Sequence, residues 1–122
     1  MARILVVDDS PTEMFRFKEI LNKNGYTVLE ATNGADGVTV AQAEQPDLVL
    51  MDVVMHGVNG FQATRQIARG EKTKHIPIVI VSTKDQATDR VWGKRQGASD
   101  YLTKPVDENK LIEVIRQYIN AG

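Results

Sequence analysis

Short runs of consecutive aliphatic residues alternate along the chain with longer segments in which apolar residues recur every three or four positions. The short runs are typical of buried strands, and the longer segments are typical of helices that bury one face. Their regular alternation predicts repeated strand–helix units on a parallel sheet. Five units fit, with strands expected at 3–7, 27–31, 48–51, 78–81 and near 101–102.

Residues that begin and end helices separate these strands. The segment Ser10-Pro11-Thr12-Glu13 has the pattern of a capping box with proline at the first helical position, and Gly25 is placed to end that helix. Asn33 can cap a second helix, which Pro46 must end. The remaining helices are expected at about 61–69, at 86–96 before Gly97, and after the N-cap candidate Asp107.

The polarity of the strands predicts their order in the sheet. The runs at 3–7, 48–51 and 78–81 are apolar at successive positions, as expected for central strands covered by helices on both faces. The strand at 27–31 includes Glu30 and has the character of an edge. We therefore expect an α/β, flavodoxin-like, doubly wound (βα)5 fold with a five-stranded parallel sheet of order 2-1-3-4-5. Such sheets bind ligands at the carboxyl ends of the strands, here between the first and third.

Length and charge limit the function classes. The chain has 122 residues, the size of one domain, so we expect 1–122 to form a single domain with no separate output domain. Fifteen basic against 16 acidic residues give no field that favours nucleic acid or an anionic membrane. The apolar runs are too short for a signal peptide or a transmembrane helix. We expect a cytoplasmic monomer without a nucleic-acid partner or membrane insertion.

Polar side chains directly follow four of the predicted strands, and in a parallel sheet such positions meet at one edge. They are Asp8 and Asp9, Asp52, Ser82 and Lys104. Two carboxylates about 4 Å apart repel by roughly 4 kcal/mol at an effective dielectric near 20, so a cation must join them. An all-oxygen cluster without Cys or His suits Mg²⁺, which commonly shares its ligands with phosphate.

The same residues suggest phosphoryl chemistry once a hard cation is present. A carboxylate such as Asp52 can act as a nucleophile toward phosphorus and form an acyl phosphate. Lys104 would neutralise part of the phosphoryl charge, and the Ser82 hydroxyl would hydrogen-bond one of its oxygens.

Each of these residues also has a purely structural interpretation. Asp9 could cap the first helix, and Asp52 could begin a turn. Ser82 or Thr83 could cap the fourth helix, and Lys104 could be a solvated lysine. The joint pattern favours a site, because independent structural causes would not place all of these residues at one edge of the sheet.

Five ordered motifs resemble the receiver domain of two-component response regulators. They are Val7-Asp8-Asp9-Ser10, Leu50-Met51-Asp52-Val53-Val54-Met55, Asn59-Gly60, Val81-Ser82-Thr83 and Tyr101-Leu102-Thr103-Lys104-Pro105. The resemblance covers the whole chain. It implies that Asp52 takes a phosphoryl group from a histidine kinase, with Mg²⁺ held by Asp9, Asp52 and the backbone carbonyl of Val54. Asp8 would act through a metal-bound water.

The resemblance also assigns the remaining residues and a partner. It implies that Lys104 and Ser82 hold the phosphoryl oxygens, and that Tyr101 is a switch aromatic that turns inward when Ser82 moves. Such a protein is no enzyme toward other substrates and catalyses only its own phosphorylation and dephosphorylation. A narrower resemblance, to single-domain regulators of bacterial twitching motility, implies a chemotaxis-type kinase, a downstream motility protein and control of type IV pili. A phosphate sink, or an interaction module that needs no phosphorylation, would keep the same acceptor site.

One feature departs from the family pattern. The family usually has Met-Pro after the phosphoacceptor strand, whereas this chain has Met55-His56. Replacing proline frees a backbone dihedral and restores an amide donor, which is either a tolerated loop change or a way to bring His56 to the phosphoryl group.

The fourth predicted helix carries a candidate residue for partner binding. Val91 and Trp92 are adjacent and cannot both point fully into the core, so a partly exposed Trp92 is either a partner anchor or a packing residue. Arg90, Lys94 and Arg95 are interpreted as a solvated face of the same helix, or as groups that steer an acidic partner.

Overall fold

The fold is the predicted doubly wound sheet, seen in a computed structural model that describes residues 2–55, 57 and 59–119. One five-stranded parallel sheet has the order β2-β1-β3-β4-β5. The strands are β1 Arg3–Val7, β2 Thr27–Ala31, β3 Leu48–Met51, β4 Ile78–Ser82 and β5 Asp100–Thr103. The helices are α1 Pro11–Lys23, α2 Gly34–Glu44, α3 Gly60–Arg69, α4 Ala87–Arg95 and α5 Glu108–Ile119. His56 lies outside the described residues.

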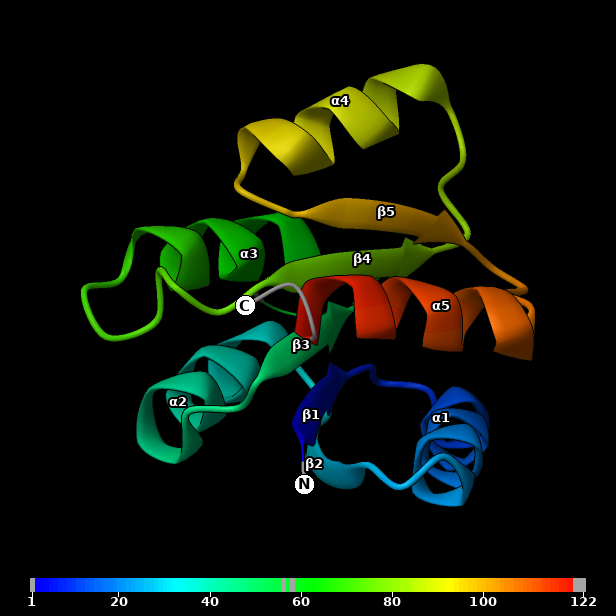
Figure 1. Cartoon of the computed structure of the whole chain (residues 1–122). Coiled ribbons are helices and arrows are strands. Elements are labelled where there is room, and N and C mark those ends of the chain that lie inside the picture. The colour runs from blue at the N-terminus through cyan, green and yellow to red at the C-terminus, as the bar shows by residue number, and fades with distance from the viewer. Residues whose placement is uncertain (1, 56, 58, 120–122) are drawn as a thin grey trace.

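Two apolar clusters lie on opposite faces of the sheet. Helices α1 and α5 cover one face, α2 and α3 cover the other, and α4 lies alongside the edge strand β5 (Figure 1). All residues of β3 and β4 are buried, as are four of the five in β1. This burial explains the continuous apolar runs in the sequence, because a central strand with helices on both faces has no side chain that points to water.

The first helix begins as predicted, but its cap differs from a full capping box. Ser10 is the N-cap, and its Oγ accepts a hydrogen bond from the Glu13 N–H at 3.3 Å. The Ser10 N–H donates to Asp8 Oδ1 at 2.9 Å, where a capping box would use the Glu13 carboxylate. The Glu13 side chain faces the carboxyl edge of the sheet instead.

The fourth helix begins at Ala87, within one residue of the predicted start. Its N-cap is Gln86, and the Gln86 N–H donates to the Asp89 carboxylate at 3.2 Å. The suggestion that Ser82 or Thr83 caps this helix is therefore wrong. The physical reason is that β4 continues to Ser82, which still pairs with Thr103 of β5, so a loop must follow before a helix can start.

The other predicted helix ends are confirmed. Asn33 caps α2 through its side chain, and Asp107 accepts the Lys110 N–H at the start of α5. Gly25 and Gly97 follow α1 and α4 with positive φ angles of 87° and 109°, which glycine adopts at little cost. Among the described residues, no helix has the length and apolar character needed to cross a membrane.

Candidate functional site

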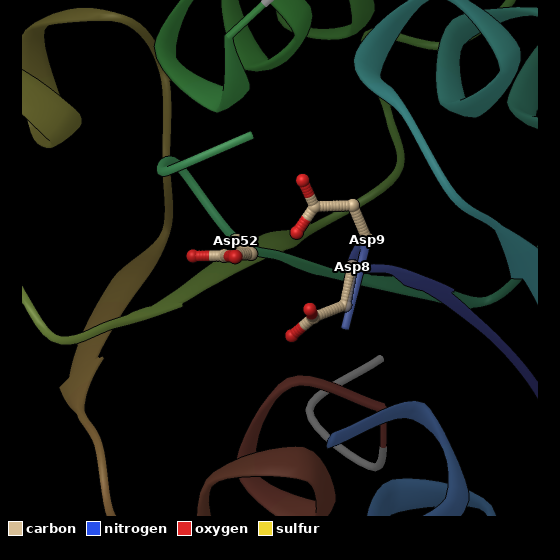
Figure 2. Close-up of side chains that lie close together, drawn as sticks. All are labelled: Asp8, Asp9 and Asp52. Atoms are coloured by element: carbon tan, nitrogen blue, oxygen red, sulfur yellow. The ribbon is translucent and has the colours of Figure 1, made fainter. Parts of the chain in front are cut away.

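Three carboxylates meet where β1 and β3 end. Val7 pairs with Met51 in the parallel ladder, so the next residues of the two strands, Asp8 and Asp52, lie side by side. The ladder continues through the site, since the Asp52 N–H donates to the Val7 carbonyl at 2.9 Å. One oxygen each of Asp8, Asp9 and Asp52 lies within 4.8 Å of the others (Figure 2). The structure thus brings together the three acids that the sequence pattern singled out.

Lys104 reaches this acidic cluster from the carboxyl end of the edge strand β5. Its backbone N–H donates to the Ser82 carbonyl at 2.8 Å, which continues the β4–β5 pairing by one residue. Its Nζ donates to Asp8 Oδ2 at 2.8 Å and lies 3.8 Å from Asp52 Oδ2. Burial alone would lower the pKa of Lys104, but the Asp8 hydrogen bond and the nearby carboxylate charges outweigh burial and raise it. The ammonium group therefore stays charged inside the site.

Ionisation of the Asp52 carboxyl is unfavourable because the residue is buried. The residue is 7% exposed, and this burial raises the pKa of its carboxyl to about 6, although Lys104 and the Val54 N–H both favour the ionised form. The Val54 N–H donates to Asp52 Oδ1 at 3.2 Å. Val54, whose carbonyl is the predicted metal ligand, thus already contacts the Asp52 carboxylate through its own N–H. A cation that binds beside this buried carboxylate would stabilise its ionised form.

A glycine lets the next helix approach the same strand end. A Cβ on Gly60 would lie 2.0 Å from the Asp52 carbonyl oxygen and 2.5 Å from the Val53 Cα. Any side chain would therefore push α3 away from the backbone of Asp52. Asn59 caps this helix through a complete capping box with Gln62, so the Asn59-Gly60 pair both starts α3 and seats it beside the site.

Ser82 and Tyr101 are linked through the loop after β4. Ser82 is fully buried, and its Oγ accepts the Lys84 N–H at 3.2 Å. The Lys84 carbonyl in turn accepts the Tyr101 hydroxyl at 2.7 Å. Tyr101 is 3% exposed, so its ring already points inward, and burial raises the pKa of its hydroxyl. The ring is therefore already in the inward position that the predicted switch would reach.

Two residues near the site were missed or misjudged from the sequence. Glu13 Oε1 lies 3.7 Å from Lys104 Nζ, which makes it a third carboxylate around the ammonium group. Its capping-box position concealed this contact, and only its place in the first turn after Asp8-Asp9 could have signalled it. Arg90 is exposed, as a residue of a solvated face would be, but its guanidinium also donates hydrogen bonds to Tyr101 and Thr103 of β5, which the sequence did not indicate.

The apolar residues of α4 also differ from a simple packing role. Val91 and Trp92 are both exposed, at 53% and 49%, which agrees with the expectation that they cannot both point fully into the core. The reason is that α4 lies along the edge of the sheet, where Gly93 is its one buried residue. Trp92 is partly exposed, as the alternative of a partner anchor requires.

The cluster suits a small hard cation. Within the part of the chain that the structure describes, its ligand atoms are all carboxylate oxygens, and two of its three residues are buried. Mg²⁺ typically takes one or two carboxylates and fills its other positions with water and phosphate oxygens. The donor set therefore fits Mg²⁺ bound at the open end of the sheet.

Comparison with known proteins decides the family. The model of the response regulator receiver domain matches residues 4–116. The chain belongs to this family. Protein PilH of Pseudomonas aeruginosa is 64% identical over 115 residues, which cover 94% of this receiver domain and 95% of that protein. The response regulator PleD of Caulobacter vibrioides is 38% identical over 94% of the chain, but the match spans 25% of its length.

Solved structures agree with this receiver fold. Chemotaxis protein CheY4 of Vibrio cholerae superposes with a TM-score of 0.91 at 28% identity, covering 97% of this chain and 98% of that one. The receiver domain of a sensor histidine kinase from Pseudomonas aeruginosa has the same TM-score and identity over 98% of both chains. That structure holds a magnesium ion coordinated in its active site cleft.

Proposed function

We propose that this receiver domain is a phosphoryl acceptor in two-component signalling and that Asp52 is the acceptor. The proposal rests mainly on one observation, the buried Asp52 carboxylate beside Asp8, Asp9 and Lys104 at the open edge of the sheet. The donor is a phosphohistidine of a sensor kinase. The P–N bond of the phosphohistidine breaks, its imidazole nitrogen keeps the electron pair, and an oxygen of Asp52 forms the new bond to phosphorus.

Mg²⁺ would be held by Asp9, Asp52 and the Val54 backbone carbonyl, with Asp8 acting through a bound water. When present, the ion supplies positive charge that offsets the repulsion among the carboxylates and the incoming phosphoryl oxygens. The close approach of the three acids supports this assignment, because ionised carboxylates so near one another need a counter-charge beyond the single Lys104 ammonium.

Lys104 and Ser82 would contact the phosphoryl oxygens. The Lys104 ammonium already lies 3.8 Å from Asp52 Oδ2, so a short movement away from Asp8 brings it to a group bonded to Asp52. Ser82 is held at the end of the adjoining β4 strand, and its hydroxyl can exchange the Lys84 N–H for a phosphoryl oxygen. Both contacts are charge-assisted hydrogen bonds, which are the stronger kind.

The relatives support a role in motility. The similarity to PilH extends over 94% of this chain and 95% of that protein, and we propose that this receiver signals through its own surface. A chemotaxis-type histidine kinase would supply the phosphoryl group, and the output would act on type IV pili. Phe15 is 62% exposed and lines a depression of about 280 Å³ together with Asp8 and Asp9, which offers the kinase an apolar contact beside the acceptor.

The test is intact mass spectrometry after incubation with acetyl phosphate, for the wild type and Asp52→Asn, with Mg²⁺ or with EDTA. We expect one phosphoryl adduct that requires both the metal and Asp52. Circular dichroism of each sample confirms that the chain is folded. A folded wild type that gains no adduct in Mg²⁺, or an adduct that persists in Asp52→Asn, would contradict the proposal.

A further inference from the structure

The Tyr101 ring is held in its inward position from two sides. Its hydroxyl donates to the Lys84 carbonyl at 2.7 Å. Over the ring lies the Arg90 guanidinium, with its central carbon 5.2 Å from the ring centroid, a distance at which a cation is attracted to an aromatic face. An outward swing of the ring would give up both contacts.

Arg90 also joins α4 to the free edge of the sheet. Its Nη1 donates to the Tyr101 carbonyl at 3.1 Å, and its Nη2 donates to Thr103 Oγ1 at 2.6 Å. Because β5 is an edge strand, its outward carbonyl groups have no further strand to accept from. The Arg90 guanidinium donates hydrogen bonds at this free edge, and it links α4 to Tyr101 and to Thr103.

The position of α4 depends on the ring beneath it. Gly93 is the one buried residue of this helix. A Cβ at Gly93 would lie 3.1 and 3.3 Å from two carbons of the Tyr101 ring and 2.9 Å from Ile80 Cδ1. The helix backbone thus packs directly on the inward ring, and removing the ring would leave a void under α4. Inward Tyr101 and the observed placement of α4 support each other.

We propose that Arg90 is a positioning residue that holds Tyr101 inward, and α4 against β5, before any phosphoryl group arrives. The surface of α4 and β5 then has its inward form in the unphosphorylated protein. A phosphoryl group on Asp52 acts on this surface through the loop that joins Ser82 to Lys84, because the Lys84 amide bonds to Ser82 and its carbonyl bonds to Tyr101. This last step rests on the proposed phosphoryl transfer, whereas the role of Arg90 does not.

The first experiment uses the unphosphorylated protein with ¹³C-labelled tyrosine rings and isoleucine methyl groups. The chain has three tyrosines, and Tyr101→Phe identifies the signals of interest. Nuclear Overhauser contacts between the Tyr101 ring and Ile80 Cδ1 report the inward position. Arg90→Met keeps an unbranched, flexible apolar stem but removes the guanidinium, and Arg90→Lys keeps the charge without the planar fork of donors. Lys94→Met removes a charge from an exposed position of the same helix.

We expect strong Tyr101–Ile80 contacts in the wild type and in Lys94→Met. In Arg90→Met the ratio of inward to outward ring should fall about tenfold, with Arg90→Lys between the two, because the guanidinium makes several contacts of modest strength. Tyr26, which packs in the cluster on the other face of the sheet, shows whether each variant is folded. Unchanged contacts in a folded Arg90→Met protein would overturn the proposal.

The second experiment repeats the measurement with acetyl phosphate and Mg²⁺, with the adduct verified by mass. The wild-type contacts should stay within the range of the unphosphorylated protein, whereas Arg90→Met should regain most of its lost intensity. A wild-type ring that begins outward and turns inward only with the adduct would overturn the proposal. If no adduct forms, the proposed phosphoryl transfer fails, and the unphosphorylated samples still decide the role of Arg90.

Discussion

Replacing Asp52 with Asn should stabilise the metal-free protein at neutral pH. Asp52 is a buried carboxylate with two other acids nearby, and Asn has almost the same shape without the charge. The change removes the proposed acceptor and also the group whose ionisation the fold opposes most. Ionised Asp52 destabilises the folded state, so removing its charge should raise the free energy of unfolding even though the proposed function is lost.

The magnitude follows from the shifted pKa. Burial raises the pKa of Asp52 from 3.8 to about 6, a shift of about two units. Each unit corresponds to about 1.4 kcal/mol, so ionised Asp52 costs the folded state about 3 kcal/mol at pH 7. The Asn side chain gives up the favourable charge of Lys104, which the raised pKa already includes. We therefore expect the free energy of unfolding to rise by about 2 to 3 kcal/mol.

The pH dependence has a definite sign. A carboxyl whose pKa is higher in the folded state binds its proton more tightly there, so the wild type loses stability as the pH rises from about 4 through 6. Well below the ordinary pKa of 3.8 the carboxyl is protonated in both states, so the wild type and Asp52→Asn should differ little there and only slightly at pH 4. The advantage of the variant should appear between pH 4 and 6 and remain constant above.

Urea unfolding in EDTA at pH 4, 5, 6 and 7 measures this difference. Glu113→Gln, an amide substitution at an exposed position of α5, is the matched control and should change the free energy of unfolding very little. Adding Mg²⁺ at pH 7 should reduce the difference in the free energy of unfolding between the wild type and Asp52→Asn, because a cation bound to the carboxylates stabilises the wild type more than the variant. A variant no more stable than the wild type at pH 7, or equally favoured at pH 4, would refute the electrostatic argument.

Three further substitutions test other parts of the site. Lys104→Met leaves ionised carboxylates without their buried partner, and it should lower the free energy of unfolding in EDTA by about 3 kcal/mol, a loss that Asp52→Asn partly restores in urea titrations. Gly60→Ala places a methyl group against the Asp52 backbone, and it should cost about 1 to 3 kcal/mol in urea and reduce the yield of the phosphoryl adduct. Ser10→Ala removes the N-cap of α1 and should cost about 1 kcal/mol in thermal unfolding while the adduct yield stays unchanged.

The backbone of this fold could be predicted because its signals are local. Apolar runs of four or five residues specify the central strands, and capping residues such as Ser10 and Asn33 specify where helices begin. The acidic cluster follows from the same information, since residues after neighbouring parallel strands must meet at one edge. The end of a strand was harder to predict where pairing with a neighbouring strand determines it. Ser82 belongs to β4 because it pairs with Thr103 of β5.

Long side chains that join separate elements could not be placed in this way. Glu13 was assigned to a capping box and Arg90 to a solvated face, because each position is typical of that local role. Their actual partners, Lys104 and the edge of β5, depend on how α1 and α4 are packed against the sheet. A side chain with several rotatable bonds can satisfy either role, and only the tertiary structure selects one.

The inward position of Tyr101 shows what this difference means for signalling. The family resemblance implies that Tyr101 is the switch residue, but the position of its ring depends on a balance of weak contacts from Arg90, Lys84 and Gly93. Each contact is worth about 1 kcal/mol, so one substitution on α4 is enough to shift the populations of the two ring positions severalfold. Receivers that share every residue of the acceptor site can therefore differ in how far phosphorylation alters their surface.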